Sequence, residues 1–229
     1  MDRLTRAEEL AANLADVRAR IDAARAAAGR SDEVALIAVT KTWPLDDVRV
    51  LADLGLRDFG ENRDQEARPK AEGFARADGR AVRWHFIGQL QSNKARSVVQ
   101  YAHMVHTVDR PSLAEALARA ATAPLDVLLQ LSIDGDTHRG GVPVEGLAAL
   151  LDAIPDPLRV RGIMAVAPLG MDPDDAFRIV AGAHTRLRER HPDASVRCIG
   201  MSADLEAAVR QGATHVRVGS ALLGPRTVR

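Results

Sequence analysis

The sequence contains a single cysteine, Cys198, among its 229 residues, so one chain can form neither a disulfide framework nor a cysteine metal cluster. A reducing compartment fits this count, and we expect a cytoplasmic protein. Long hydrophobic runs are missing too: no segment approaches the length of a membrane span, and residues 1–14 lack the apolar stretch of a secretion signal. We therefore expect no membrane segment.

An excess of charge of one sign is also absent, because 31 Lys and Arg balance 31 Asp and Glu. Surfaces that attract nucleic acid or membranes electrostatically normally carry excess positive charge. We therefore expect small-molecule partners, no nucleic acid and no membrane. Aromatic residues make up 3% of the chain, and Tyr101 is its only tyrosine.

What is present is a regular alternation of short apolar runs and longer amphipathic stretches. The spacing of apolar residues over 4–28 predicts a leading helix that ends at Gly29. Apolar runs then predict eight strands, at 34–40, 58–60, 84–87, 104–108, 126–133, 160–166, 196–199 and 214–218. The stretches between them predict helices at 45–54, 62–74, 91–101, 111–121, 144–153, 173–190 and 202–211.

Eight strand–helix alternations behind an extra helix predict an α/β protein with one (β/α)₈ TIM barrel, and we expect residues 1–229 to form a single domain. The chain length agrees with one such barrel. A doubly wound open sheet is the alternative, because alternation along a sequence cannot show that a sheet closes.

Lys41 is the most informative residue of the chain. It follows the apolar run 34–40, and the alternation of a strand would put it on the inward face with Ala35, Ile37 and Val39. Burial lowers the pKa of a lysine, and the neutral amine can condense with a carbonyl group. Two interpretations stay open: a Schiff-base lysine, or a lysine at a strand end that reaches solvent, as most lysines do.

Hydroxyl and glycine residues follow the last two predicted strands. Ser202 stands where a helix is predicted to begin, and Gly219 and Ser220 open the final turn. Free backbone N–H groups and two hydroxyls could converge there on one anion, and the loops after strands seven and eight are the usual phosphate position of a barrel. The alternative is that Ser202 only caps its helix and Gly219 only ends a strand.

Arg217 is a second cation on an inward position, because it alternates with the apolar Val216 and Val218. A guanidinium inside a barrel needs an acceptor, which could be an Asp or Glu side chain or a ligand atom. An amine, a phosphate site and an arginine together match the aldehyde, phosphate and ring nitrogen of pyridoxal 5'-phosphate, PLP.

Six blocks of the sequence, at 38–42, 59–62, 84–94, 161–165, 200–208 and 216–224, resemble the pyridoxal phosphate homeostasis protein family. The resemblance implies a PLP-binding barrel like the amino-terminal domain of alanine racemases. It implies that Lys41 holds the cofactor as a Schiff base and that Arg217 faces the pyridine nitrogen. It further implies that Ser202, Gly219 and Ser220 contact the phosphate and that Asn62 and His85 line the pocket.

Two positions depart from the family pattern. Many relatives carry a second lysine where Trp43 stands, and another lysine near Arg139. A secondary role of those lysines in cofactor transfer is therefore in doubt for this chain.

The loop around Arg139 also carries Asp134, Asp136 and His138, which could hold a divalent ion. Acidic glycine-rich turns are common, however, and we expect no metal. Residues 200–204 lack the final glycine of a nucleophile elbow, which argues against a serine hydrolase.

Catalysis at an amino acid α-carbon would need more than this chain offers. Racemization requires two bases and an electron sink. The second base in racemases of this fold is a tyrosine from an added domain, whereas Tyr101 ends a predicted helix away from the strand ends. A cationic Arg217 would also oppose protonation of the ring nitrogen.

We therefore expect no enzyme but a monomeric PLP carrier that supplies apo PLP-dependent enzymes. The alternatives are a PLP-dependent amino-acid racemase or decarboxylase, and a Schiff-base aldolase that acts on phosphorylated sugars without a cofactor.

Overall fold

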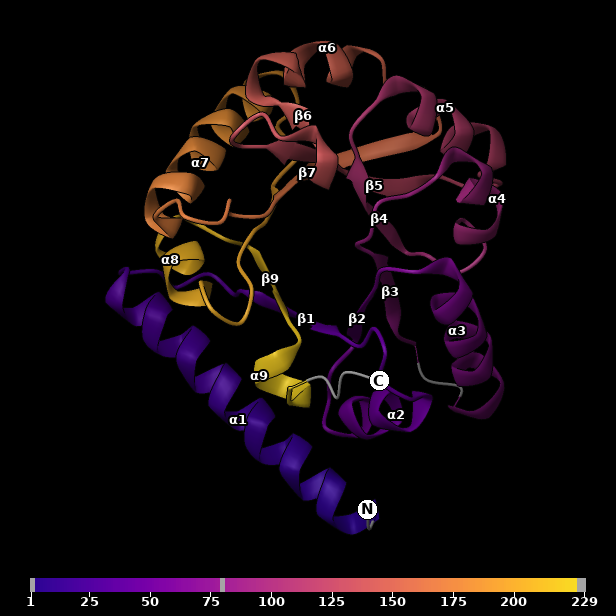
Figure 1. Cartoon of the computed structure of the whole chain (residues 1–229), viewed down its shortest axis with the longest axis vertical. Helices are drawn as coiled ribbons and strands as arrows, with labels where there is room; N and C mark the ends of the chain where they lie inside the picture. The colour runs from indigo at the N-terminus through magenta and orange to yellow at the C-terminus, as the bar shows by residue number, and fades with distance from the viewer. Residues whose placement is uncertain (1–2, 79–80, 226–229) are drawn as a thin grey trace.

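The computed structural model describes residues 3–78 and 81–225, and its centre is a parallel sheet that closes on itself (Figure 1). Around the ring, each strand pairs with the next in the order β1, β2, β3, β4, β5, β7, β8, β9, and β9 pairs with β1. The predicted TIM barrel is therefore confirmed, and the open sheet is excluded. The strands are β1 (Ala35–Val39), β2 (Asp58–Glu61), β3 (Arg83–Phe86), β4 (Met104–Val108), β5 (Leu125–Ser132), β7 (Leu158–Ala165), β8 (Val196–Cys198) and β9 (His215–Val218).

Helices surround the barrel on its outer side (Figure 1). Those of the outer ring are α2 (Leu45–Asp53), α3 (Asp64–Asp78), α4 (Ala95–Val98), α5 (Pro111–Ala120), α6 (Leu147–Asp152), α7 (Pro173–Arg190) and α8 (Leu205–Arg210). The helix predicted at 91–101 is shorter than expected, because it consists of the 3₁₀ turn η1 (Ser92–Lys94) and α4. The helix predicted at 144–153 consists of the 3₁₀ turn η3 (Val144–Gly146) and α6. Three short elements were not predicted: η2 (Thr137–Arg139), β6 (Val142–Pro143) and α9 (Ser220–Leu223).

The alternation of side chains along the strands gives the barrel two apolar layers. The outward residues Leu36 and Ala38 join the large core beneath the helices, whereas Ile37 lies inside the barrel. The inner cluster is small and consists of Ile37, Met104, Leu128, Met164 and Cys198. The inward position predicted for Ile37 is confirmed. Strand β1 ends at Val39, however, so Lys41 lies in the turn after the strand rather than on it.

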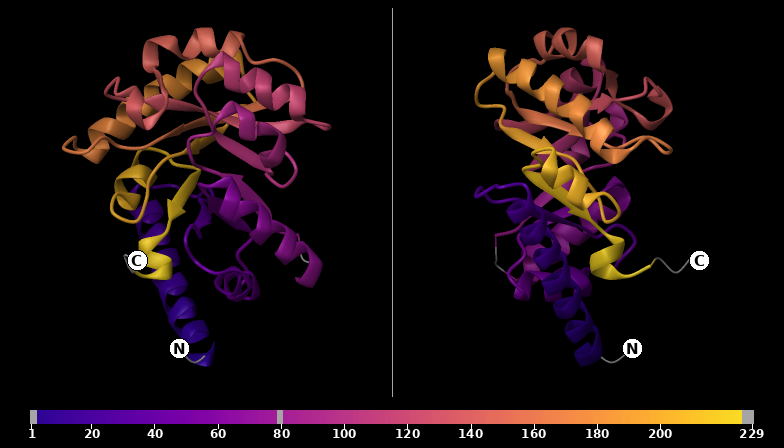
Figure 2. Two further views of the ribbon diagram at one scale, coloured as in Figure 1. Left: turned by 45° about the vertical axis from the view of Figure 1, so that its right-hand side comes forward. Right: turned by 90° about the vertical axis from the view of Figure 1, so that its left-hand side faces the viewer.

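The leading helix α1 (Arg3–Ala27) packs on α8, α9 and α2, and its amino-terminal end extends beyond the barrel (Figure 2). Three of its polar side chains donate to carbonyls near the last two strand ends. Arg20 Nη2 lies 3.0 Å from Ser202 O, and Asn13 Nδ2 lies 3.0 Å from Leu222 O. Arg6 Nη2 lies 3.0 Å from the carbonyl of the next residue, Leu223. The helix therefore braces the loops that follow β8 and β9.

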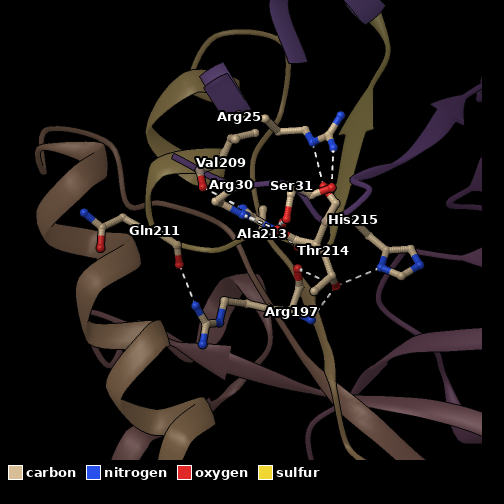
Figure 3. A network of polar contacts seen from close by, with 10 residues as sticks. Arg25, Arg30, Ser31, Arg197, Val209, Gln211, Ala213, Thr214 and His215 are labelled. Atoms are coloured by element: carbon tan, nitrogen blue, oxygen red, sulfur yellow. Dashed lines mark hydrogen bonds and ion pairs between the residues drawn. The ribbon is translucent and has the colours of Figure 1, made fainter. Parts of the chain in front are cut away.

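At the opposite end of the barrel, arginines bind carbonyls in the last turn of α8 and in the residues that follow it (Figure 3). Arg30 donates to Val209 O at 2.7 Å and to Ala213 O at 2.9 Å, and Arg197 donates to Gln211 O at 2.6 Å. The last carbonyls of a helix have no partner within the helix, and the arginines add hydrogen bonds to this segment. The contacts fix α8 and the start of β9, and with them the two loops at the other end.

Strands β7 and β8 approach each other closely at Gly162. Its φ is +150°, and a Cβ built there would lie 1.8 Å from Val196 O. A residue with a Cβ would fit this position only if the backbone moved.

Within the described ranges, no helix is long and apolar enough to cross a membrane.

Candidate functional site

Five of the seven predicted site residues follow four neighbouring strands, whereas His85 and Arg217 lie on β3 and β9 themselves. Lys41 follows β1, Asn62 follows β2, Ser202 follows β8, and Gly219 and Ser220 follow β9. These strands are adjacent in the order β2, β1, β9, β8, and all are parallel. Their carboxyl ends therefore meet on one side of the barrel mouth, where barrel enzymes place their chemistry.

Lys41 is half-buried in a tight turn at this mouth. The turn is closed by the hydrogen bond from Trp43 N to Thr40 O, at 3.0 Å. Trp43 is partly buried against the core, and the guanidinium carbon of Arg6 lies 4.8 Å from its ring centroid. The residue that replaces the second family lysine therefore packs against α1 and contacts a cation.

Ser202 and the first turn of α9 come together, as predicted. Ser202 Oγ accepts a hydrogen bond from Ala221 N at 3.3 Å. The prediction that a helix begins at Ser202 is wrong, because α8 begins at Leu205 and residues 202–204 form a turn. That turn is held by Asp204, whose Oδ1 accepts from Met201 N. The Ser202 hydroxyl therefore serves the loop after β9 and does not cap α8.

The Arg217 guanidinium lies inside the barrel, and the residue is 4% exposed. Nη1 donates to Cys198 O at 2.7 Å and to Cys198 Sγ at 3.1 Å, and Nη2 donates to Ala165 O at 2.9 Å. These acceptors are the carboxyl ends of β8 and β7. Backbone carbonyls, rather than the Asp or Glu side chain that was one of the two predicted acceptors, hold the guanidinium beneath the mouth.

His85 belongs to a buried hydrogen-bond network that the sequence did not reveal. Its Nε2 lies 2.8 Å from Asp58 Oδ1, and its Nδ1 lies 2.8 Å from His106 Nε2. Burial would raise the pKa of Asp58, but hydrogen bonds from His85 and Arg83 outweigh it and hold that pKa well below its usual range. Burial lowers the pKa of His106 well below its ordinary value, and the charge of His85 adds to this.

His106 lies at one end of this network, and its Nδ1 is buried without a hydrogen-bond partner within the described residues. His85 itself is 2% exposed and already bonded on both ring nitrogens, so its expected role in lining the pocket stays a prediction. Inward polar residues on the neighbouring strands β2, β3 and β4 were the signal that could have revealed the network.

Asn62 is partly exposed directly after β2. Its backbone is pressed against Gly88, because a Cβ at Gly88 would lie 2.1 Å from Asn62 O. This contact joins the mouth ends of β2 and β3 and fixes where the Asn62 side chain starts.

The acidic residues of the loop after β5 contact other residues of the same loop. Arg139 forms ion pairs with both Asp134 and Asp136, and His138 N donates to Asp136 Oδ1 at 3.0 Å. No group of three or more His, Cys, Asp or Glu residues positioned for a metal occurs among residues 3–78 and 81–225.

Tyr101 donates its hydroxyl to Asp64 Oδ1 at 3.3 Å, and burial raises the pKa of this phenol.

Comparison with known proteins decides the family. The family model described as the alanine racemase N-terminal domain matches residues 12–227. A curated relative from Mycobacterium leprae, named pyridoxal phosphate homeostasis protein, is 43% identical, with 98% of this chain and 95% of that protein covered. The Escherichia coli K12 protein of the same name is 38% identical, with 95% and 97% covered. The chain belongs to the pyridoxal phosphate homeostasis protein family.

Solved structures agree with this membership of the pyridoxal phosphate homeostasis protein family. PipY of Synechococcus elongatus PCC7942, solved with PLP bound, matches with a TM-score of 0.81 at 33% identity, covering 94% of this chain and all of that one. A structure described as an unknown protein from Bifidobacterium adolescentis matches with a TM-score of 0.89 at 30% identity, covering 95% of this chain and 96% of that one. Corynebacterium glutamicum alanine racemase shares the fold at 18% identity and a TM-score of 0.69, covering 94% of this chain and 60% of that one.

Proposed function

We propose that this protein binds PLP at the mouth formed by β8, β9, β1 and β2, holds it through a Schiff base to Lys41, and takes part in PLP homeostasis. The observation that carries the proposal is the convergence of one half-buried lysine, the Ser202–Ala221 contact and the buried Arg217 on these adjacent strands. PLP bound to PipY and the names of the curated relatives support it.

The residues present fit this cofactor. Gly219 lies beside β1, where a Cβ would make an ordinary contact of 3.4 Å with Val39 Cβ, and it directly precedes α9. The Ser220 amide and the hydroxyls of Ser202 and Ser220 would hold the phosphate. Arg217 would face the ring nitrogen, and its positive charge would oppose protonation of that nitrogen. When bound, PLP supplies an aldehyde, which condenses with the Lys41 amine and releases water.

Substitution of Lys41 by alanine tests the covalent link. Purified wild-type protein mixed with PLP should absorb in the visible range, and borohydride should fix the ligand to Lys41 in a peptide map. Lys41→Ala should abolish the fixed ligand, because the amine that remains near the mouth end of β1, that of Lys70, is engaged by Glu61 and Thr40 O, whereas Lys94→Ala should keep it. An adduct of wild-type yield in Lys41→Ala would disprove the assignment.

Substitution of Ser202 by alanine tests the phosphate contacts. Loss of the hydroxyl removes the acceptor of Ala221 N and one phosphate donor, so we expect PLP affinity to fall about tenfold. Affinity for pyridoxal, which lacks the phosphate, should change little. Titration with both compounds provides the measurement, and equal losses for the two would argue against a phosphate site at Ser202.

We further propose that the protein is a carrier without strong catalysis, a monomer of one domain in the cytoplasm, and a supplier of PLP to apo PLP-dependent enzymes. The names of the curated relatives support a role in homeostasis. The hydroxyl of Tyr101, the one tyrosine of the chain, is engaged by Asp64, which disfavours it as a second base. The competing racemase function predicts repeated incorporation of solvent deuterium at an amino acid α-carbon.

A further inference from the structure

The turn that carries Lys41 is strained. In the lysine turn, which we define as residues 40–43, Lys41 and Thr42 occupy the two central positions. Thr42 has a φ of +69° and is the one non-glycine residue with positive φ among residues 3–78 and 81–225. This conformation is unfavourable for a β-branched side chain and persists only where the surroundings enforce it.

Two residues of α3 enforce the conformation of the lysine turn. Glu66 Oε2 accepts a hydrogen bond from Thr42 N at 2.9 Å, and Lys70 Nζ donates to Thr40 O at 2.8 Å. Glu66 and Lys70 are four residues apart, so they share one face of the helix. The peptide groups on both sides of Lys41 are therefore held by the same helix.

A buried carboxylate completes the arrangement. Glu61 Oε1 accepts from Lys70 Nζ at 2.7 Å and from Thr40 Oγ1 at 2.7 Å. We call Glu61, Glu66 and Lys70 the α3 clamp, because Glu61 on β2 works with the two residues of α3. The Lys70 side chain is 12% exposed and that of Glu61 is 1% exposed.

The α3 clamp is poorly explained as a device for stability alone. Burial raises the pKa of Glu61, although the charge of Lys70 acts against it, and Glu61 Oε2 has no hydrogen-bond partner within the described part of the chain. A buried ion pair with an unsatisfied oxygen is often no more stabilising than apolar residues of similar size. The need to hold the neighbouring Lys41 side chain in one direction explains the α3 clamp better.

We propose that the α3 clamp and the left-handed Thr42 are positioning elements that aim the Lys41 amine at the carbonyl carbon of its ligand. This inference rests on the proposed function. With the clamp in place, both peptide planes around Lys41 are fixed, and so is the direction in which its side chain leaves the backbone. Without the clamp, Thr42 returns to a negative φ and the amine turns away from the mouth.

The same contacts assign different tasks to the lysines. Only three of the 31 basic residues are lysines, namely Lys41, Lys70 and Lys94. The Lys70 side-chain nitrogen is engaged by one carboxylate and one carbonyl, so it is not directed at a ligand in the mouth. Lys94 lies at the end of η1, outside the clamp. A covalent adduct can therefore be assigned among three side-chain amines by a peptide map.

The first experiment removes the buried pair of the clamp, Glu61 and Lys70, leaves Glu66 in place, and creates no buried unpaired charge. The double variant Glu61→Gln/Lys70→Met is compared with wild type and with Lys94→Met, using PLP and 4'-deoxypyridoxine 5'-phosphate, which has no aldehyde. We expect the dissociation constant for PLP to rise about tenfold or more in the double variant. The Thr40 carbonyl loses its hydrogen bond from the Lys70 ammonium, and the Thr40 hydroxyl no longer donates to a charged carboxylate. Binding of the deoxy compound should stay within about twofold.

The second experiment tests the strained residue itself and does not depend on folding of the double variant, because the Thr42 side chain is exposed. Glycine adopts a positive φ freely, whereas proline cannot. Thr42→Pro should therefore lose at least about tenfold more PLP affinity than Thr42→Gly. The two variants should bind the deoxy compound alike.

The outcomes separate the two proposals. If wild type forms no adduct at Lys41, the proposed function fails, and the positioning inference fails with it. If wild type forms the adduct and the clamp variants match it, or if they lose affinity equally for PLP and the deoxy compound, only the positioning inference is overturned.

Discussion

Replacement of Gly162 by alanine should lower the free energy of unfolding by about 3 kcal/mol or more. The added Cβ would lie 1.8 Å from Val196 O, and the φ of +150° is one that other residues rarely adopt. Strands β7 and β8 would have to separate where they pair, and the barrel closes through that pairing. Urea denaturation followed by circular dichroism measures the change.

Gly182→Ala is the matched control for this substitution. Gly182 lies inside α7, where a Cβ would meet only Arg186 Nη1, at 3.9 Å. Alanine should therefore stabilise the protein by about 0.5–1 kcal/mol, because it favours the helix and restricts the unfolded chain. If Gly162→Ala changed stability as little as this control, the close approach of β7 and β8 would be refuted.

Acidification from pH 7 to pH 4 should cost the native state about 3 kcal/mol through His184 alone. The residue is 3% exposed; its Nε2 lies 2.7 Å from Ala194 O, and its Nδ1 accepts from Arg197 Nε at 3.2 Å. Burial lowers the pKa of His184 to about 4, the charge of Arg197 adds to this, and the hydrogen bond to Ala194 opposes it. Protonation of Nδ1 would set two donors against each other.

The sign of the effect follows from the two states. An unfolded histidine has a pKa of about 6.5, so between pH 6.5 and 4 this residue is mostly protonated in the unfolded chain and mostly neutral in the native state. The stabilisation is complete above about pH 6.5 and is lost as the pH falls toward 4. His215, whose pKa burial also lowers to about 4, adds to the loss.

His184→Gln separates the contribution of His184 from the rest. The glutamine amide can make the same two hydrogen bonds but does not titrate. Urea denaturation at several pH values should show a loss of stability on acidification that is smaller by about 3 kcal/mol in the variant. Parallel curves for the two proteins would show that His184 is not the titrating group.

Apolar patterning was sufficient for the barrel and insufficient for its smallest elements. The run 126–133 marks β5, which spans Leu125–Ser132, because eight residues show a period clearly. Strand β6 has two residues and α9 a single turn, so neither has a period that a sequence can display. Closure came from the pairing of β9 with β1, which no local pattern contains.

The candidate site divides in the same way. Lys41, Ser202 and Gly219 were predicted because each follows an apolar run, and strand ends of a parallel barrel meet at one edge. Lys70 was missed because a lysine on an amphipathic helix is normally solvated. His106 was missed because its significance depends on the rings and carboxylates of neighbouring strands, which only the folded chain brings within 2.8 Å.

The brace formed by α1 has a practical consequence for handling this protein. Arg6, Asn13 and Arg20 hold the carbonyls of Leu223, Leu222 and Ser202, so the first helix supports the very loops proposed to grip phosphate. A purification tag joined to the projecting amino-terminal end leaves these contacts intact. Trimming the chain past Arg6 would instead erode the preference for phosphorylated over free vitamers while the barrel itself still stands.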